Sequence, residues 1–137
     1  MRMRRLFLLG DGEVCDLVSE LAGWLSYDEV SRGDDPPAVV GVEDHVVVHA
    51  RDPARARSLI ARVLAVGDPA YLGLVATEKE ALVTLLKLAS ERVEKARLDR
   101  VSAPAGHSLA GVATSPKETA IAVAAELLAA RRSSTHS

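Results

Sequence analysis

The chain has 137 residues, of which 48% are hydrophobic, 26% are charged and 3% are aromatic, and its formal net charge is −2. This length predicts one domain with a substantial core, and the high apolar fraction excludes a disordered chain. The near-neutral charge and the scarcity of aromatic side chains argue against a nucleic-acid binder, which needs a basic field and stacking platforms.

Strand-like and helix-like segments alternate along the first part of the chain. The run "RRLFLLG" (4–10) is almost wholly apolar after its first residues, which indicates a strand buried on both faces. Apolar residues then recur at helical spacing over 14–25. Three strand predictions follow: a weak one in "SYDEVSR" (26–32), a short one in "AVVGV" (38–42) and the strongest in "HVVVHA" (45–50).

The next helix carries clear start and stop signals. Asp52 is a residue type that caps helices, Pro53 stands at the first helical position, and Gly67 ends the apolar pattern. These signals predict a helix over 52–67. The apolar run "AYLGLVA" (70–76) predicts a further buried strand.

The rest of the chain is predicted to be mostly helical. Thr77 and Glu80 have the spacing of a capping box, which predicts the start of a long helix over 77–98. A short strand is expected within 99–106, and a last helix over 115–132.

The alternation of strands and helices predicts the fold class. It indicates an α/β protein with a three-layer, Rossmann-like fold and a mostly parallel sheet. We expect a single domain over 1–132 and a disordered tail over 133–137. Ligands of such sheets bind beyond the carboxyl ends of the strands, near the switch point. The segments that follow the strands are therefore the candidate sites: "GDGEVC", "SRGDD", "HARDP" and "GLVAT".

Cysteine usage and hydropathy bear on the location of the protein. The chain has one cysteine and so cannot form an internal disulfide, which fits a reducing compartment. The first ten residues are basic and then apolar, as in a signal peptide, but the apolar run is too short and meets "DGE" at once. No apolar run is long enough to span a membrane. We expect a cytoplasmic protein that contacts neither membrane nor nucleic acid.

The turn after the first strand is the first candidate site. Gly10 and Gly12 match the first two glycines of the dinucleotide-binding fingerprint, and Cys15 takes the third place. In that interpretation, the backbone N–H groups of the helix start, up to Val14, bind the anion. The alternative is a purely structural strand-to-helix turn.

Charged residues near this turn leave the ligand open. Asp11 and Glu13 place two carboxylates beside the proposed phosphate site, and they would also stabilise a helix start by themselves. An acid such as Asp34 or Asp35, about 20 residues beyond the glycines, favours the free ribose of NAD. Arg32 would instead suit the 2′-phosphate of NADP. A solvated polar loop explains the same residues equally well.

The segment after the strongest strand supplies further candidate contacts. Arg51 could neutralise a phosphate and stands next to Asp52, while His49 is close enough to the strand's end to reach a ligand. His45 and His49 lie about 13 Å apart, at about 3.3 Å per residue, so they cannot share one metal. His107 is a further candidate contact. No Ser–His–Asp or paired-acid pattern predicts catalytic residues, and we expect no metal site.

Several blocks, in one order, resemble a known family. They are "LFLLGDGEVC", "HVVVHARDP", "AYLGLVATEKEALVTLL", "RVSAPAG" and "SPKETAIAVAAELLAARR". They are similar to the C-terminal Rossmann domain of the xanthine dehydrogenase accessory factor family (XdhC/CoxI), whose members typically read "LLIFGAGHVA" at the first block and "VVVMTHDP" at the second. Glu13 replaces a usual histidine, and Ala50 and Arg51 stand where threonine and histidine are usual. The scaffold is thus kept better than the polar site.

The resemblance implies a Rossmann-like fold and a role in maturing molybdenum enzymes, since members are thought to bind the molybdenum cofactor and help its sulfuration and insertion. We therefore expect a non-catalytic protein that binds a nucleotide-type small molecule, NAD(P) or the molybdenum cofactor. Its expected partner is a molybdenum hydroxylase or a separate accessory subunit. An NAD(P)-dependent oxidoreductase and a nucleotide-sensing regulatory domain remain as alternatives. The apolar helix segment "TAIAVAAELLAA" (119–130) favours a homodimer.

Overall fold

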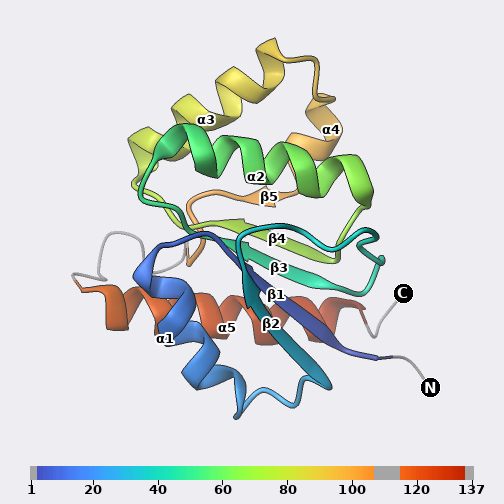
Figure 1. The fold of residues 1–137 in the computed structure, drawn as a ribbon, viewed down its shortest axis with the longest axis vertical. Helices are drawn as coiled ribbons and strands as arrows, with labels where there is room; N and C mark the ends of the chain where they lie inside the picture. Colours follow the sequence, from blue (N-terminus) through green and yellow to red (C-terminus); the bar gives the residue numbers. More distant parts are fainter. Residues whose placement is uncertain (1–2, 107–114, 135–137) are drawn as a thin grey trace.

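The structure, a computed structural model, describes residues 3–106 and 115–134. Five strands in these residues form one parallel sheet in the order β2-β1-β3-β4-β5 (Figure 1). The strands are β1 (Arg5–Leu9), β2 (Glu29–Gly33), β3 (His45–Val48), β4 (Tyr71–Leu74) and β5 (Val101–Ser102). The helices are α1 (Glu13–Ala22), α2 (Pro53–Val66), α3 (Glu78–Ser90), α4 (Lys95–Leu98) and α5 (Pro116–Ser134). The predicted α/β, Rossmann-like class is confirmed.

Helices cover both faces of the sheet, which explains the continuous apolar runs of its central strands. Helices α1 and α5 lie on one side, and α2 and α3 on the other (Figure 1). Leu6 and Leu8 of β1 belong to the core beneath α1 and α5, whereas Phe7 and Leu9 belong to the core beneath α2. Successive strand residues point to opposite faces, so a strand covered on both sides must be apolar at every position.

The strand order places a switch point between β1 and β3. The chain leaves β1 through α1 toward β2 and leaves β3 through α2 toward β4, so the two connections run to opposite faces. In sheets of this order, the crevice beyond the carboxyl ends of the strands is the usual ligand site. Here the turn after β1 and the segment after β3 meet at this crevice, with the backbone N–H of Gly12 donating to the His49 carbonyl oxygen at 2.8 Å.

The helix start signals act as the sequence predicts. The Asp52 carboxylate accepts a hydrogen bond from the Ala54 N–H at 3.0 Å and caps α2. Thr77 and Glu80 form a complete capping box at the start of α3. Such caps satisfy N–H groups that have no partner within the helix.

The strand predicted over 38–42 is wrong. Among the residues that the structure describes, the segment forms one isolated bridge, between Val40 and Gly67. Val39 and Val42 are 68% and 75% exposed, so no face of the segment is buried continuously. The Asp44 carboxylate accepts the Gly41 N–H at 2.7 Å and turns the chain before β3 begins.

The single long helix predicted over 77–98 is also wrong, because α3 ends at Ser90 and the short α4 follows. Arg92 adopts a positive φ of 70° between the two helices. The change of direction lets Leu98 pack into the core beneath α2. It also brings the Arg97 guanidinium to the carbonyl oxygens of Leu64 and Gly67 at the carboxyl end of α2, where a cation is favourable.

The last helix is longer than the sequence suggests. Helix α5 continues to Ser134 and so includes two residues that were assigned to the tail, while 135–137 lie outside the described residues. Within the described part of the chain, no helix combines the length and the apolar character needed to cross a bilayer.

Candidate ligand-binding site

The two glycines of the β1–α1 turn are required by close packing against the end of β3. Gly10 has a φ of 104°, and a Cβ there would lie 2.3 Å from the His49 carbonyl oxygen. A Cβ on Gly12 would lie 2.1 Å from Cγ of the His49 ring. A side chain at position 10 would therefore push the turn away from the backbone after β3, and one at position 12 would displace the His49 ring.

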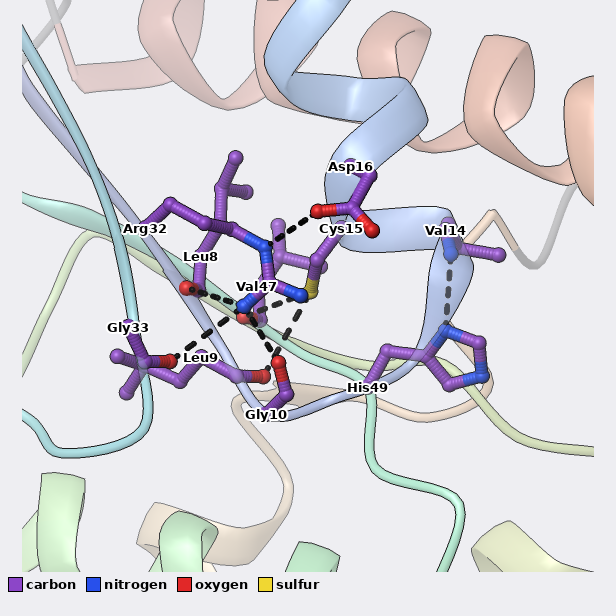
Figure 2. A network of polar contacts seen from close by, with 10 residues as sticks. All are labelled: Leu8, Leu9, Gly10, Val14, Cys15, Asp16, Arg32, Gly33, Val47 and His49. Atoms are coloured by element: carbon purple, nitrogen blue, oxygen red, sulfur yellow. Dashed lines mark hydrogen bonds and ion pairs between the residues drawn. The ribbon is translucent and has the colours of Figure 1, made fainter.

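His49 accepts hydrogen bonds at the start of α1 through its side chain as well as through its backbone carbonyl oxygen. The Val14 N–H donates to Nδ1 of His49 at 3.1 Å (Figure 2). An accepting nitrogen carries no proton, so the neutral ring carries its proton on Nε2. Burial lowers the pKa of His49, although the nearby carboxylates of Glu13 and Asp11 act in the opposite direction. The ring is therefore a neutral group at the turn at physiological pH.

Asp11 and Glu13, the two acids of the β1–α1 turn, face different parts of the site. The Asp11 carboxylate accepts the Arg51 N–H at 2.9 Å, and this hydrogen bond lowers the pKa of Asp11. Glu13 instead lines the cleft described below. Asp11 thus ties the turn after β1 to the segment after β3, beside the contacts of His49.

Arg32 lies at the carboxyl end of β2 and points back to β1 (Figure 2). Its Nε donates to Oδ1 of Asp16 at 2.9 Å, and its guanidinium also donates to the Gly10 carbonyl oxygen. Asp34, one of the acids considered for a ribose, forms an ion pair with Arg55 at 3.4 Å. The charged groups at the end of β2 are thus paired within the protein.

An open cleft of about 910 Å³ lies beyond the carboxyl ends of β3 and β4. The starts of α1, α3 and α5 contribute to its wall. Some residues predicted from sequence line it: Glu13, Val14, His49 and Arg51. The other predicted residues are not in its lining: Gly10, Asp11, Gly12, Arg32, Asp34 and Asp52.

Several residues of the cleft lining were not among the site residues predicted from the sequence. Thr77 and Lys79 at the start of α3, Ala105 after β5, and Ser115 and Thr119 at the start of α5 all belong to the wall. The strand-end rule had already marked the segment "GLVAT" (73–77), which contains Thr77, and applied to β5 as well it would have reached Ala105. Lys79 is a second cation of the lining, in addition to Arg51.

The remaining cysteine and histidine candidates have packing roles where the structure describes them. Cys15 is fully buried, and burial raises the pKa of its thiol to about 11. His45 is buried too, with Nδ1 at 2.6 Å from the hydroxyl of Tyr27. His107 lies outside the described residues. Across 3–106 and 115–134, no group of three or more His, Cys, Asp or Glu side chains is placed to hold a metal ion.

A five-stranded parallel sheet with a switch point and a cleft at the carboxyl ends of its strands defines a Rossmann-like α/β domain. Comparison with protein families agrees, because the XdhC Rossmann domain model matches residues 6–127. The chain belongs to the XdhC Rossmann domain family, as its sequence blocks indicated. A search of curated proteins found no match.

Proposed function

We propose that this chain is a non-catalytic accessory domain that binds an anionic cofactor in the cleft and presents it to a molybdenum enzyme. The cofactor is the molybdenum cofactor or a related nucleotide. Membership in the XdhC Rossmann domain family supports the accessory role. The observation that carries the proposal is the cleft itself, whose wall holds two cations, Arg51 and Lys79, and the neutral ring of His49 together with three acids, Glu13, Glu78 and Glu80.

The cleft fits a phosphate-bearing cofactor in size and in chemistry. Cofactor pockets usually measure about 300–1,000 Å³, and the volume of this cleft falls in that range. Arg51 and Lys79 offer charge-assisted hydrogen bonds to a phosphate. Val75, Ala76 and Ala105 give an apolar wall for a ring system. When bound, the molybdenum cofactor would supply its metal chemistry to the acceptor enzyme, while these residues hold and orient it.

The thiol of this chain is not placed to carry sulfur. Cys15 is fully buried between α1 and the sheet, with its Sγ 3.6 Å from the Leu9 carbonyl oxygen. A sulfur carrier must expose a reactive thiolate, and a thiol whose pKa is raised to about 11 is not one. This supports a holding role for the domain rather than sulfur transfer by it.

No observation favours the oxidoreductase alternative. A nicotinamide dinucleotide places its diphosphate against the amides of the glycine turn. Here the N–H groups of Gly12 and Val14 donate to His49.

Ligand-induced stabilisation tests the proposal. The protein should be titrated with purified molybdenum cofactor, CMP and AMP while thermal unfolding is followed. A ligand that binds only the folded state raises its stability by about 2.7 kcal/mol at a hundredfold excess over Kd. Arg51→Ala and Lys79→Ala should each weaken binding about tenfold or more. Arg62→Ala is the matched control, since this arginine pairs with Asp35 at the surface and is not in the cleft lining.

The proposal is overturned if neither the molybdenum cofactor nor a nucleotide changes the unfolding temperature. It is also overturned if the Arg62→Ala control loses binding as strongly as the two cleft variants do.

A further inference from the structure

We infer that the cleft takes a compact phosphomonoester, of the size of a mononucleotide, and excludes a dinucleotide that spans the switch point. This inference rests on the proposed function and narrows its ligand class. It follows from which half of the crevice is open and which half the protein fills with its own side chains.

A dinucleotide on a sheet of this kind needs two places. Its diphosphate lies on the glycine turn after β1, against the first amides of α1. Its adenosine half extends over the end of β2, where an acid or an arginine reads the ribose. Both places belong to the β1–β2 side of the switch point.

The place for the diphosphate is filled by His49. The imidazole ring lies so close over Gly12 that an added Cβ would be 2.1 Å from it. The ring and carbonyl of His49 accept the N–H groups of Val14 and Gly12. The carboxylates of Asp11 and Glu13 stand at the same turn and repel a diphosphate in addition.

The place for the adenosine half, over the end of β2, is not part of the cleft either. Among the described residues, the cleft lining includes none from β2 or from the loop that follows it. Arg32 donates to the Gly10 carbonyl oxygen and to Asp16, and Asp34 pairs with Arg55. A ribose at this position would have to break interactions that the protein already makes.

The open half of the crevice suits a single phosphate on a ring. Arg51 and Lys79 are the cations of its described lining, and Glu13, Glu78 and Glu80 are its acids. One phosphate dianion can pair with these two cations although the three acids lie in the same lining, whereas a second phosphate would add further negative charge next to those acids with no cation left to pair with it.

Calorimetry with mononucleotides and dinucleotides tests the inference. The wild-type protein is titrated with AMP, CMP, nicotinamide mononucleotide, NAD and NADP at one ionic strength. We expect at least one mononucleotide to bind, and NAD and NADP to bind at least tenfold more weakly than it. A dinucleotide that binds within tenfold of that mononucleotide, or more tightly, overturns the inference and leaves the proposed function standing.

Absence of binding by all five probes also overturns the inference. The proposed function is then decided separately, by the response of thermal unfolding to the molybdenum cofactor. The two failures are therefore distinguishable.

A variant at the filled place gives an independent readout. His49→Ala removes both the ring that covers Gly12 and the nitrogen that accepts the Val14 N–H, so the place for a diphosphate becomes open. The affinity for NAD relative to the bound mononucleotide should rise about tenfold, while Arg62→Ala leaves this ratio unchanged. An unchanged ratio in a folded His49→Ala protein overturns the inference.

Amide NMR on the wild-type protein avoids any dependence on the variant's folding. A bound mononucleotide should shift the amide signals of Lys79 and Ala105, which line the cleft, and leave that of Gly12 in place. A large shift of the Gly12 amide, without shifts at the other two, overturns the inference.

Discussion

Replacing Gly12 by alanine tests the packing between His49 and the β1–α1 turn. Gly12 has a φ of −75° and a ψ of 145°, a conformation that alanine adopts without strain. The added Cβ, however, would lie 2.1 Å from Cγ and 2.2 Å from Nδ1 of His49. Non-bonded carbon atoms rest about 3.5–4.0 Å apart, so the ring must move by more than 1 Å. That movement breaks the hydrogen bond from the Val14 N–H to Nδ1.

The expected loss of stability follows from these two effects. Overpacking of a closely packed site costs about 1–3 kcal/mol, and the lost hydrogen bond adds about 1 kcal/mol. Gly12→Ala should therefore lower the free energy of unfolding by about 2–4 kcal/mol. Urea unfolding followed by circular dichroism measures it, with the slope of the transition showing whether the folded state has changed.

Two further variants isolate the cause. Gly33→Ala is the matched control, because a Cβ there would meet no atom within 4 Å, and it should change stability by less than about 1 kcal/mol in either direction. In a His49→Ala background the ring is gone, so Gly12→Ala should cost less than about 1 kcal/mol. The reasoning is refuted if Gly12→Ala costs as much with His49 removed as with the ring present.

Further predictions concern buried titratable groups. Stability should fall as the pH drops from about 7 through the unfolded-state histidine pKa of 6.5 toward the lower folded pKa of His49, since only the unfolded ring takes up a proton there. A slope that is equally steep in His49→Ala, measured by urea titration at several pH values, contradicts this. Cys15, whose pKa is raised to about 11, should react with a thiol reagent at pH 8 only after unfolding in urea, and fast reaction of the native protein contradicts its burial. Tyr71→Phe removes the hydroxyl that donates to Oε1 of Glu126 at 2.7 Å and should lower the free energy of unfolding by about 1–3 kcal/mol, measured by urea titration; an unchanged midpoint contradicts it.

The sequence predicts those parts of the fold that depend on local chemistry. Caps such as Asp52 and Thr77 satisfy amides a few residues away, so their spacing alone locates the starts of α2 and α3. The segment 38–42 was mistaken for a strand because its apolar letters do not reveal that Val39 and Val42 face solvent. Burial at such short segments depends on distant parts of the chain.

The break between α3 and α4 shows the same limit. Propensity and periodicity favour one continuous helix there, and Arg92 gives no sign of its positive φ. The cause lies in tertiary structure, where Leu98 fills the core and the Arg97 guanidinium reaches the end of α2. Neither contact has a signature that can be read within the segment.

The site was predictable in location but not in its contacts. The strand-end rule places it at the carboxyl edge, where the cleft lies. The rule does not say that Arg32 and Asp34 would find partners within the protein while Lys79 lines the cleft. Those pairings depend on how far each side chain stands from its neighbours across the sheet.

The meaning of two glycines after a buried strand depends on the residue that faces them from the next strand of the sheet. Close approach of backbone to a phosphate and close approach of backbone to a side chain both require glycine, so the spacing of Gly10 and Gly12 is the same in either case. What differs is residue 49. The typical family block "VVVMTHDP" has methionine at this place, and a thioether is too weak an acceptor to hold the Val14 N–H. In this chain His49 accepts this N–H and covers Gly12, so the glycine turn is packed against a side chain of the protein, and the open cleft lies on the β3–β5 side of the crevice.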